Sequence, residues 1–394
     1  SGRISGSRQE KPMSHRAFVS AGLPALVIAV SLAVEPAKGL PLTSRQSPWL
    51  VDSVCFGALR APGPRCEPQP VQNSRSEPHS GPVTAQAPAT KPFTPPPSTY
   101  HPPRTPWGDP DLMGVWDYQS VIRMERPGDL AGKARFADAA EYEAWARANA
   151  PNRDTERGVG AYNEWWNDRN FVRNLNTSLI VDPPDGRYPP LTPAAEQRRK
   201  EILARASQLA SWEDYHALAR CIASQTPNAP QAYNSGTHIM QSPGWVVIVR
   251  ERLDTRLIPL DGRPHVGQNI RHWNGDPVGR WEGNTLVVET TNFTDKQRLG
   301  GGSGASVPEG IPFGNFHVIE HFVPVGPSRI EYYATIIDPT TWTRPWTFNL
   351  PWERDDDYTI FEYACHEGNY ALTNSLRGER VREAEAAKTR EAGR

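Results

Sequence analysis

The sequence predicts a mainly β fold, an antiparallel barrel or sandwich that carries an α-helical insertion. After Cys221 the chain consists of short apolar runs that alternate with turns rich in Gly, Pro, Asn and Asp. Residues 245–249 are continuously apolar, which is typical of a strand buried on both faces. Short strands at regular spacing indicate an antiparallel sheet rather than βαβ units. Further strands are predicted at residues 257–260, 285–291, 316–323, 330–338, 347–350 and 359–365.

The chain before Cys221 predicts the first strand and the helices. A Gly-x-Trp triplet at residues 114–116 enters the first strand, and this feature is similar to the start of a lipocalin-like barrel. Residues 137–150 have helical spacing, with Tyr142 and Trp145 on one face. Pro193 predicts the first turn of a second helix that runs to about residue 209. We therefore expect a helical insertion from about residue 137 to Cys221.

The N-terminal residues 1–39 predict export. Residues 1–12 have the composition of a tag or of upstream read-through. The apolar residues 17–34 follow a short basic segment and precede small residues at 37–39, the pattern of a cleaved signal peptide. An uncleaved membrane anchor is the alternative, but Gly22, Pro24 and Ser31 interrupt a run that is short for spanning. We predict a secreted or periplasmic protein, with no membrane attachment after cleavage.

The rest of the chain divides into three parts. Residues 40–106 are crowded with Pro, Ser, Gln and Ala and show no hydrophobic period, which predicts a disordered linker. Residues 107–376 are predicted to form a single β-rich domain that binds a ligand or catalyses a reaction. Residues 377–394 are a charged tail. The net charge of −1 gives no reason to expect a nucleic acid or a membrane surface as partner.

The cysteines predict one disulfide. Cys55 and Cys66 lie in the linker, whereas Cys221 and Cys365 lie in the domain. A nucleophilic role for Cys365 fits poorly, because the adjacent His366 would point to the opposite face of a strand. A metal site would need a second cysteine at short spacing. A disulfide between Cys221 and Cys365 fits an exported protein best.

Two segments predict a ligand-binding site. Residues 259–293 place ionisable and aromatic side chains on glycine-rich turns next to an apolar strand, and residues 338–346 place one arginine between two indoles. Loops carried by a rigid sheet are a usual place for a site. Arginine binds planar anions and stacks on aromatic rings. The predicted substrate-binding residues are Arg263, His265, Arg271, Trp273, Trp342, Arg344 and Trp346. A structural salt bridge at a barrel rim is the alternative for Arg344.

Four residues are candidates for catalysis. Glu320 lies in an otherwise apolar row of a predicted strand, so its carboxylate is either paired or functional. Asp338 ends the next strand, and Glu320 or Asp338 would be the acid. His366 would be the base, oriented by Glu367. A histidine that is merely hydrogen-bonded is the alternative.

We predict no metal and no cofactor. Residues 317–321 read His-x-x-Glu-His, but this zinc motif needs a helix, and on a strand the glutamate points away from the two histidines. A site formed by His265, His272 and His317 or His366 would lack local ligand spacing.

Five longer strings resemble a widespread family of uncharacterised secreted bacterial proteins. They are LIVDPPDGR, PLDGRPH, GRWEGNTLVVETTNFTD, DPTTWTRPW and YACHEGN, and the resemblance covers about residues 107–376. The resemblance implies export and a single β-rich domain, and it brings no activity with it.

Two functions follow as hypotheses. The first is an exported enzyme that performs metal-independent acid/base hydrolysis or elimination on a sugar-like or aromatic small molecule. The second is a non-catalytic small-molecule-binding protein on a β-barrel scaffold. Catalysis needs a group that titrates near neutral pH, whereas binding needs only fixed charge. In both cases we expect residues 259–293, 338–346 and 365–369 to surround one cavity.

Overall fold

The structure is a computed structural model, and it describes residues 93–149, 171–206, 209–222, 226–228, 230, 234–297 and 310–393. The predicted export signal and the predicted linker up to residue 92 lie outside the described residues, as do Cys55 and Cys66. Among the described residues no helix is both long enough and apolar enough to cross a membrane.

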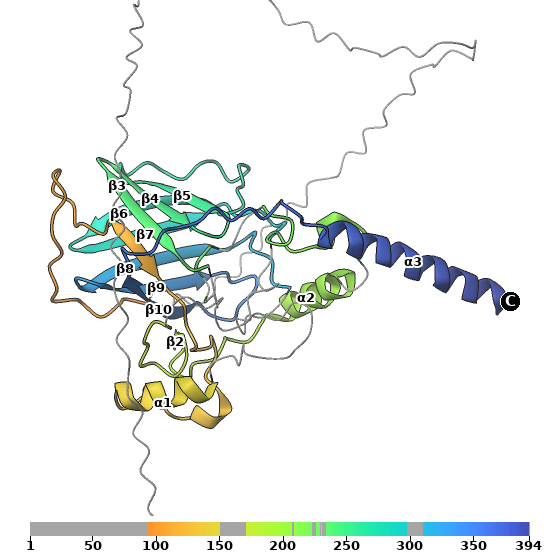
Figure 1. Ribbon diagram of the computed structural model, residues 1–394, viewed down its shortest axis with the longest axis horizontal. Coiled ribbons are helices and arrows are strands. Elements are labelled where there is room, and N and C mark those ends of the chain that lie inside the picture. The colour runs from red at the N-terminus through yellow and green to blue at the C-terminus, as the bar shows by residue number, and fades with distance from the viewer. Residues whose placement is uncertain are drawn as a thin grey trace, which may run out of the picture. The chain divides into compact units, whose positions relative to one another are not determined.

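The described strands form one antiparallel sheet that curls into a nearly closed barrel (Figure 1). Nine strands follow the path β5-β4-β3-β1-β10-β9-β8-β7-β6, and a short strand, β2, pairs with β10 beside this path. The fold class predicted from the sequence is confirmed. The strands are β1 (Gly114–Asp117), β2 (Ile180–Asp182), β3 (Thr237–Ser242), β4 (Trp245–Arg250), β5 (Asp254–Pro259), β6 (Asp276–Glu282), β7 (Thr285–Thr291), β8 (His317–Gly326), β9 (Arg329–Ile337) and β10 (Trp346–Arg354).

The barrel closes where β5 meets β6, the two ends of the strand path. Gly279 lies in the middle of β6 and faces β5. A Cβ atom at this position would lie 2.7 Å from Cγ2 of Ile258 and 2.8 Å from Cδ2 of Leu260. Contacts this short do not occur between real side chains, so the approach of the two strands depends on glycine at position 279.

Alternation along the strands separates an inner from an outer face. On β8, Val318, Glu320 and Phe322 are fully buried in the barrel, and His317 and His321 lie on the outer face, as the sequence predicts. Tyr332 on β9 and Trp352 on β10 fill the interior, with ring centroids 5.5 Å apart. The core is therefore packed with aromatic side chains.

The helices lie outside the barrel. They are α1 (Ala139–Asn149), α2 (Pro193–Ala206), the one-turn 3-10 helices η1 (Gly128–Leu130) and η3 (Trp212–Asp214), and α3 (Ala371–Ala392). Ser211 accepts a hydrogen bond from the backbone N–H of Glu213 and completes a capping box with Asp214 at η3. The helix expected at residues 193–209 is α2, which spans Pro193–Ala206, and residues 207 and 208 lie outside the described residues. In Figure 1, α3 extends away from the barrel toward the C-terminus.

Two expectations for the strands are wrong in detail. Residues 276–282 were assigned to turn-rich loops, but they form β6, which pairs with β7 as a hairpin. Residues 359–365 form no strand, and Phe361 is 63% exposed. The preceding strand, β10, pairs with β9 on one side and with β1 and β2 on the other, and residues 359–365 pair with no described strand.

The residues before the first strand run along the outer face of the barrel. We call residues 93–104 the N-terminal strap. Phe93 packs against Tyr333 of β9 with ring centroids 5.5 Å apart, and Ser98 Oγ donates to the carbonyl of Pro324 at 2.6 Å. Farther along, Arg104 donates to Oδ1 of Asn284, in the turn between β6 and β7, at 2.8 Å. Residues 93–104 are thus packed on the barrel, although the sequence assigns them to a disordered linker.

A disulfide joins the helical insertion to the segment after β10. Cys221 and Cys365 are bonded, with Cα atoms 5.6 Å apart. This pairing was predicted from the sequence and is confirmed. It closes a loop of 144 residues, so it restricts the unfolded chain strongly.

Replacement of both cysteines, C221S/C365S, should lower the free energy of unfolding by about 2–4 kcal/mol, because the unfolded chain regains the entropy of an open loop. Thermal or urea unfolding measures this loss. Addition of a reductant should destabilise the wild type by a similar amount and leave the double variant unchanged. A wild type whose stability does not respond to reductant would contradict the prediction.

Candidate functional site

Glu320, the predicted acid, is held by an ion pair inside the barrel. Arg256 on β5 donates to both oxygens of the Glu320 carboxylate, with a distance of 2.8 Å from Nη1 to Oε1. Tyr332 Oη donates to the same Oε1 at 2.8 Å. Glu320 is 0% exposed and Arg256 is 3% exposed. Burial and the nearby Glu320 charge raise the pKa of Tyr332 well above its ordinary value, so the phenol keeps its proton.

The polar interior continues from this ion pair to one end of the barrel. The backbone N–H of Asn228 donates to Tyr332 Oη at 3.2 Å, and Arg250 donates to Oδ1 of Asn228 at 2.7 Å. Arg250 also forms a buried ion pair with Asp254. The network connects β4, β5, β8 and β9 through buried hydrogen bonds and ion pairs. Glu320 therefore has the structural pairing that the sequence left as one of two alternatives.

The two predicted indoles of residues 338–346 lie in the core. Trp342 and Trp346 are each 2% exposed, with ring centroids 5.7 Å apart. Tyr188 stacks on Trp342 at 5.5 Å and meets the edge of Trp346 at 4.9 Å. Between the indoles in sequence, Arg344 forms an ion pair with Asp182 at 2.7 Å. These side chains pack against one another and against protein partners.

Asp338 ends β9 as a turn residue. Its Oδ1 accepts hydrogen bonds from the backbone N–H of Thr340 at 2.9 Å and from the Thr340 hydroxyl at 2.6 Å. This pattern is the usual way in which an aspartate closes a tight turn. Asp338 is 3% exposed.

The predicted residues of the segment after β5 are spread along an exposed loop. Arg263 pairs with Asp261, with Nε 2.9 Å from Oδ1, and this hydrogen bond lowers the pKa of Asp261 to about 2. The guanidinium also lies over the ring of Trp245 at 5.0 Å. His265 contacts Asp276, with Nδ1 3.1 Å from Oδ2.

The second half of this loop is tied to other parts of the chain. Arg271 donates to the carbonyls of Phe293, at 2.9 Å, and of Gly314. Trp273 lies under the guanidinium of Arg220, with 5.3 Å from Cζ to the ring centroid. These contacts order the loop.

His366 and Glu367 are exposed on the loop that follows the disulfide. The neighbouring Asn369 donates to the carbonyl of Ala219 at 3.2 Å, so the loop lies against the end of the helical insertion. The structure thus brings Trp342 and Trp346 together, and it places residues 365–369 beside the segment that holds Arg220. It does not bring His366 to Glu320, since one is in solvent and the other is inside the barrel.

The structure presents a different hollow on the outer face of β9 and β10, which we call the arginine pocket. Its volume is about 450 Å³. Its floor is the outward face of the two strands, and its walls are the segment before β2 and the approach to α1. The lining residues are Arg135, Ala139, Arg173, Asn174, Leu175, Asn176, Arg329, Glu331, Tyr333 and Asn349.

Backbone pairing places the walls of the arginine pocket. The N–H of Phe136 donates to the carbonyl of Leu175 at 2.8 Å, and Arg135 and Asn176 form an isolated bridge. The segment before β2 is fastened to the barrel where the N–H of Asn349 donates to the carbonyl of Leu179 at 2.8 Å. Side chains from three distant parts of the sequence therefore meet at one place.

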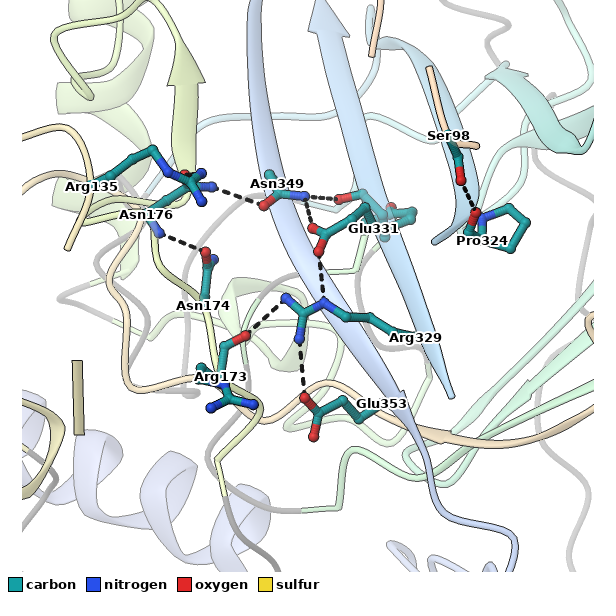
Figure 2. A network of polar contacts seen from close by, with 11 residues as sticks. Ser98, Arg135, Arg173, Asn174, Asn176, Pro324, Arg329, Glu331, Asn349 and Glu353 are labelled. Carbon is teal, nitrogen blue, oxygen red and sulfur yellow. Dashed lines mark hydrogen bonds and ion pairs between the residues drawn. The ribbon is translucent and has the colours of Figure 1, made fainter. Parts of the chain in front are cut away.

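A chain of hydrogen bonds connects the wall to the floor of the pocket (Figure 2). Arg135 Nη1 donates to Oδ1 of Asn176 at 2.7 Å, and Asn176 Nδ2 donates to Oδ1 of Asn349 at 3.0 Å. Asn349 Nδ2 donates to Oε2 of Glu331 at 2.9 Å, and Arg329 Nε donates to Oε1 of Glu331 at 2.8 Å. Each partner fixes the next, so the polar groups are preorganised.

Each of the three side-chain nitrogens of Arg329 donates a hydrogen bond. Besides Glu331, it donates to Glu353 at 3.0 Å and, through Nη2, to the carbonyl of Arg173 at 2.9 Å (Figure 2). Its role is to hold the Glu331 carboxylate and the Arg173 backbone in place. The guanidinium groups of Arg135 and Arg173 are exposed. Arg173 lies 3.9 Å from Glu143, a loose surface ion pair.

Asn174 carries a buried donor without a partner. The residue lines the pocket and is 2% exposed. Oδ1 accepts the backbone N–H of Asn176 at 2.9 Å, which sets the orientation of the amide. Nδ2 is buried and has no hydrogen-bond partner in the described part of the chain. An unmet buried donor costs about 1–3 kcal/mol, and an acceptor on a bound molecule would remove this cost.

The ionisable groups of the arginine pocket favour an anion. Three guanidinium groups line it, and one carboxylate, that of Glu331, is held by two donors. Burial, with a contribution from Glu331, raises the pKa of Tyr333 to about 12, so its hydroxyl stays protonated and neutral. The charged groups that line the pocket are thus three hydrogen-bond donors and one acceptor.

None of the binding residues predicted from the sequence lines this pocket. The available signal was the outward face of residues 329–335, where Arg329, Glu331 and Tyr333 alternate with apolar residues. A solvated outer face has the same pattern, so alternation alone does not identify a site. A second hollow of about 300 Å³, beside α2, mixes Arg205, Arg220 and Lys296 with carboxylates and has no excess of either charge.

Comparison of this chain with protein-family models, with curated proteins and with solved structures finds no match. The resemblance to a secreted bacterial family stays a prediction.

Removing one partner of the buried ion pair should strongly destabilise the barrel. The variant E320Q leaves the Arg256 charge buried without its counter-charge, and we expect a loss of about 3–5 kcal/mol in the free energy of unfolding. The double variant R256M/E320L removes both charges and should lose less than E320Q. Urea unfolding measures both. Equal midpoints for E320Q and the wild type would show that the pair does not hold the strands together.

His321 should make stability depend on pH. It is half-buried on the outer face of β8, between Val287 and Tyr333, and burial lowers its pKa below the ordinary 6.5. The unfolded chain therefore takes up a proton that the folded state resists, so this contribution is complete above pH 6.5 and is lost as the pH falls toward the folded pKa.

The variant H321Q should remove this part of the pH dependence, and H317Q serves as the control on the same face. Urea unfolding at several pH values between about 4.5 and 8 tests the prediction. Parallel pH profiles for H321Q and the wild type would refute it.

Proposed function

We propose that the protein is a binding protein for a small anionic molecule, which it holds in the arginine pocket. The observation that carries this proposal is Asn174. Its buried Nδ2 has no hydrogen-bond partner among the described residues, and it belongs to a hollow lined by three arginines. Fixed positive charge and an unmet donor are both complementary to an anion that has several acceptor atoms.

The chemistry of the pocket supports binding rather than turnover. Guanidinium groups stay charged, amides do not titrate, and Tyr333 keeps its proton because its pKa is raised to about 12. Glu331 is engaged by Arg329 and Asn349. These are groups of fixed charge and fixed geometry, which is what binding requires. The acid/base enzyme predicted from His366 and Glu320 stays a prediction.

Location outside the cytoplasm is part of the proposal. The disulfide between Cys221 and Cys365 supports it, because such bonds persist in oxidising compartments. The apolar run at residues 17–34 supports it as a signal for export. A binding protein in the periplasm or outside the cell meets its ligand directly.

Small anions should raise the melting temperature of the wild type above that in sodium chloride of matched ionic strength. The panel consists of acetate, benzoate, cyclohexanecarboxylate, sulfate, phosphate and glucuronate. In the double variant R135A/R173A we expect the effect to vanish, because the exposed guanidinium groups supply the attraction. R382A/R390A, which removes two exposed arginines of α3 outside the pocket, is the matched control.

Affinity should also fall with rising ionic strength, since salt screens exposed charges. A panel in which no anion stabilises the wild type would sink the proposal. So would an anion effect that R135A/R173A retains in full.

A further inference from the structure

The geometry points to a more specific ligand for the arginine pocket: a hydroxylated carboxylate of the size of one sugar ring, such as a uronic or aldonic acid. This inference rests on the proposed anion binding and adds the groups that the rest of the ligand must carry. It follows from what surrounds the guanidinium groups.

The size of the pocket suits one ring. Its volume of about 450 Å³ lies in the lower half of the usual range for small-molecule sites, roughly 300–1,000 Å³. A monosaccharide acid fits such a space with room for bridging water. A longer chain would have to leave the pocket.

The anionic end of the ligand belongs at Arg135 and Arg173. These guanidinium groups are exposed on the wall, and Arg135 uses only Nη1 for its bond to Asn176. Guanidinium binds a planar carboxylate through two parallel hydrogen bonds. Arg329 is excluded from this role, because Glu331, Glu353 and the carbonyl of Arg173 occupy its nitrogens.

The other polar groups of the pocket, Asn174 and Glu331, are complementary to ligand hydroxyls rather than to a second anionic group. Asn174 Nδ2 is a donor without a partner among the described residues. Each oxygen of the Glu331 carboxylate accepts one hydrogen bond from the protein, from Arg329 or from Asn349, so each oxygen has a lone pair left to accept another. A purely anionic ligand would meet repulsion at Glu331. A hydroxyl group accepts from an amide N–H and donates to a carboxylate, so it satisfies both kinds of partner at once.

A small apolar wall completes the match. Leu175 and Ala139 line the pocket with the ring of Tyr333, whose position Phe93 of the N-terminal strap supports at 5.5 Å. Sugar rings have C–H faces that pack on such surfaces, whereas their hydroxyls point sideways. The wall is small beside the polar lining, which disfavours a large aromatic ligand.

Titration calorimetry with three matched compounds tests the inference on the full folded protein. Glucuronate has the carboxylate and the hydroxyls, cyclohexanecarboxylate has the carboxylate on a ring without hydroxyls, and glucose has the hydroxyls without the charge. We expect glucuronate to bind at least about tenfold more tightly than either of the others, since each comparison removes one set of charge-assisted hydrogen bonds.

Two variants locate the effect. E331Q removes the carboxylate that would accept hydrogen bonds from the ligand hydroxyls. It should weaken the binding of glucuronate about tenfold, and cyclohexanecarboxylate should bind with the same or a higher affinity. N174D keeps the acceptor for the Asn176 N–H but replaces the unmet donor by a negative oxygen, and it should abolish glucuronate binding. A melting curve for each variant confirms that it is folded.

The outcomes separate the two proposals. If glucuronate and cyclohexanecarboxylate bind with equal affinity, the ligand is not a hydroxylated carboxylate, but anion binding stands. The same holds if sulfate and phosphate bind and neither glucuronate nor cyclohexanecarboxylate does. If none of these anions binds, both proposals fail. Selectivity for glucuronate that E331Q and N174D do not alter overturns the assignment to this pocket.

Discussion

The ion pair between Arg256 and Glu320 is the interaction on which the barrel depends. It joins β5, at one end of the strand path, to β8, which lies near the other end. Both groups are buried, so the pair is stable only while the strands hold the two charges in contact and Tyr332 supplies its hydrogen bond. Gly279 permits the same closure, because it lets β6 approach β5. Charge and steric room therefore specify one arrangement of the strands.

The interior of the barrel is filled with side chains, and the arginine pocket lies on the outer surface. Aromatic rings such as Trp352, Tyr332 and Phe322 contact one another where a lipocalin-like barrel would hold its ligand. The outward face of β9 and β10 is covered instead by the segment before β2 and by the approach to α1, which leave the arginine pocket between themselves and the sheet. The helical insertion predicted from the sequence thus supplies a wall for the site.

Strand alternation and compartment chemistry made parts of this structure predictable. The row that contains Glu320 was correctly assigned to a buried face, and Cys221 was correctly paired with Cys365. The arginine pocket was not predictable in the same way, because Arg135, Arg173 and Arg329 come from segments that only tertiary pairing brings together. Trp342 was interpreted as a ligand wall, but an indole that packs on a ligand and one that packs on Tyr188 have the same sequence. Local pattern decides which face a residue occupies, and long-range packing decides what covers that face.

Strand β10 connects stability with binding. Its inward residues, Leu350 and Trp352, pack in the core, while the intervening Asn349 points outward and joins the hydrogen-bond chain of the pocket. The backbone of Asn349 also holds the segment before β2 through the carbonyl of Leu179. The orientation of the pocket amides is therefore as rigid as the sheet beneath them, and ligand binding costs little ordering of protein groups. The unmet donor of Asn174 is tolerated because the fold is stabilised elsewhere, by the buried network inside the barrel. This separation allows the pocket to keep unsatisfied polar groups, which is the condition for binding a polar ligand from water.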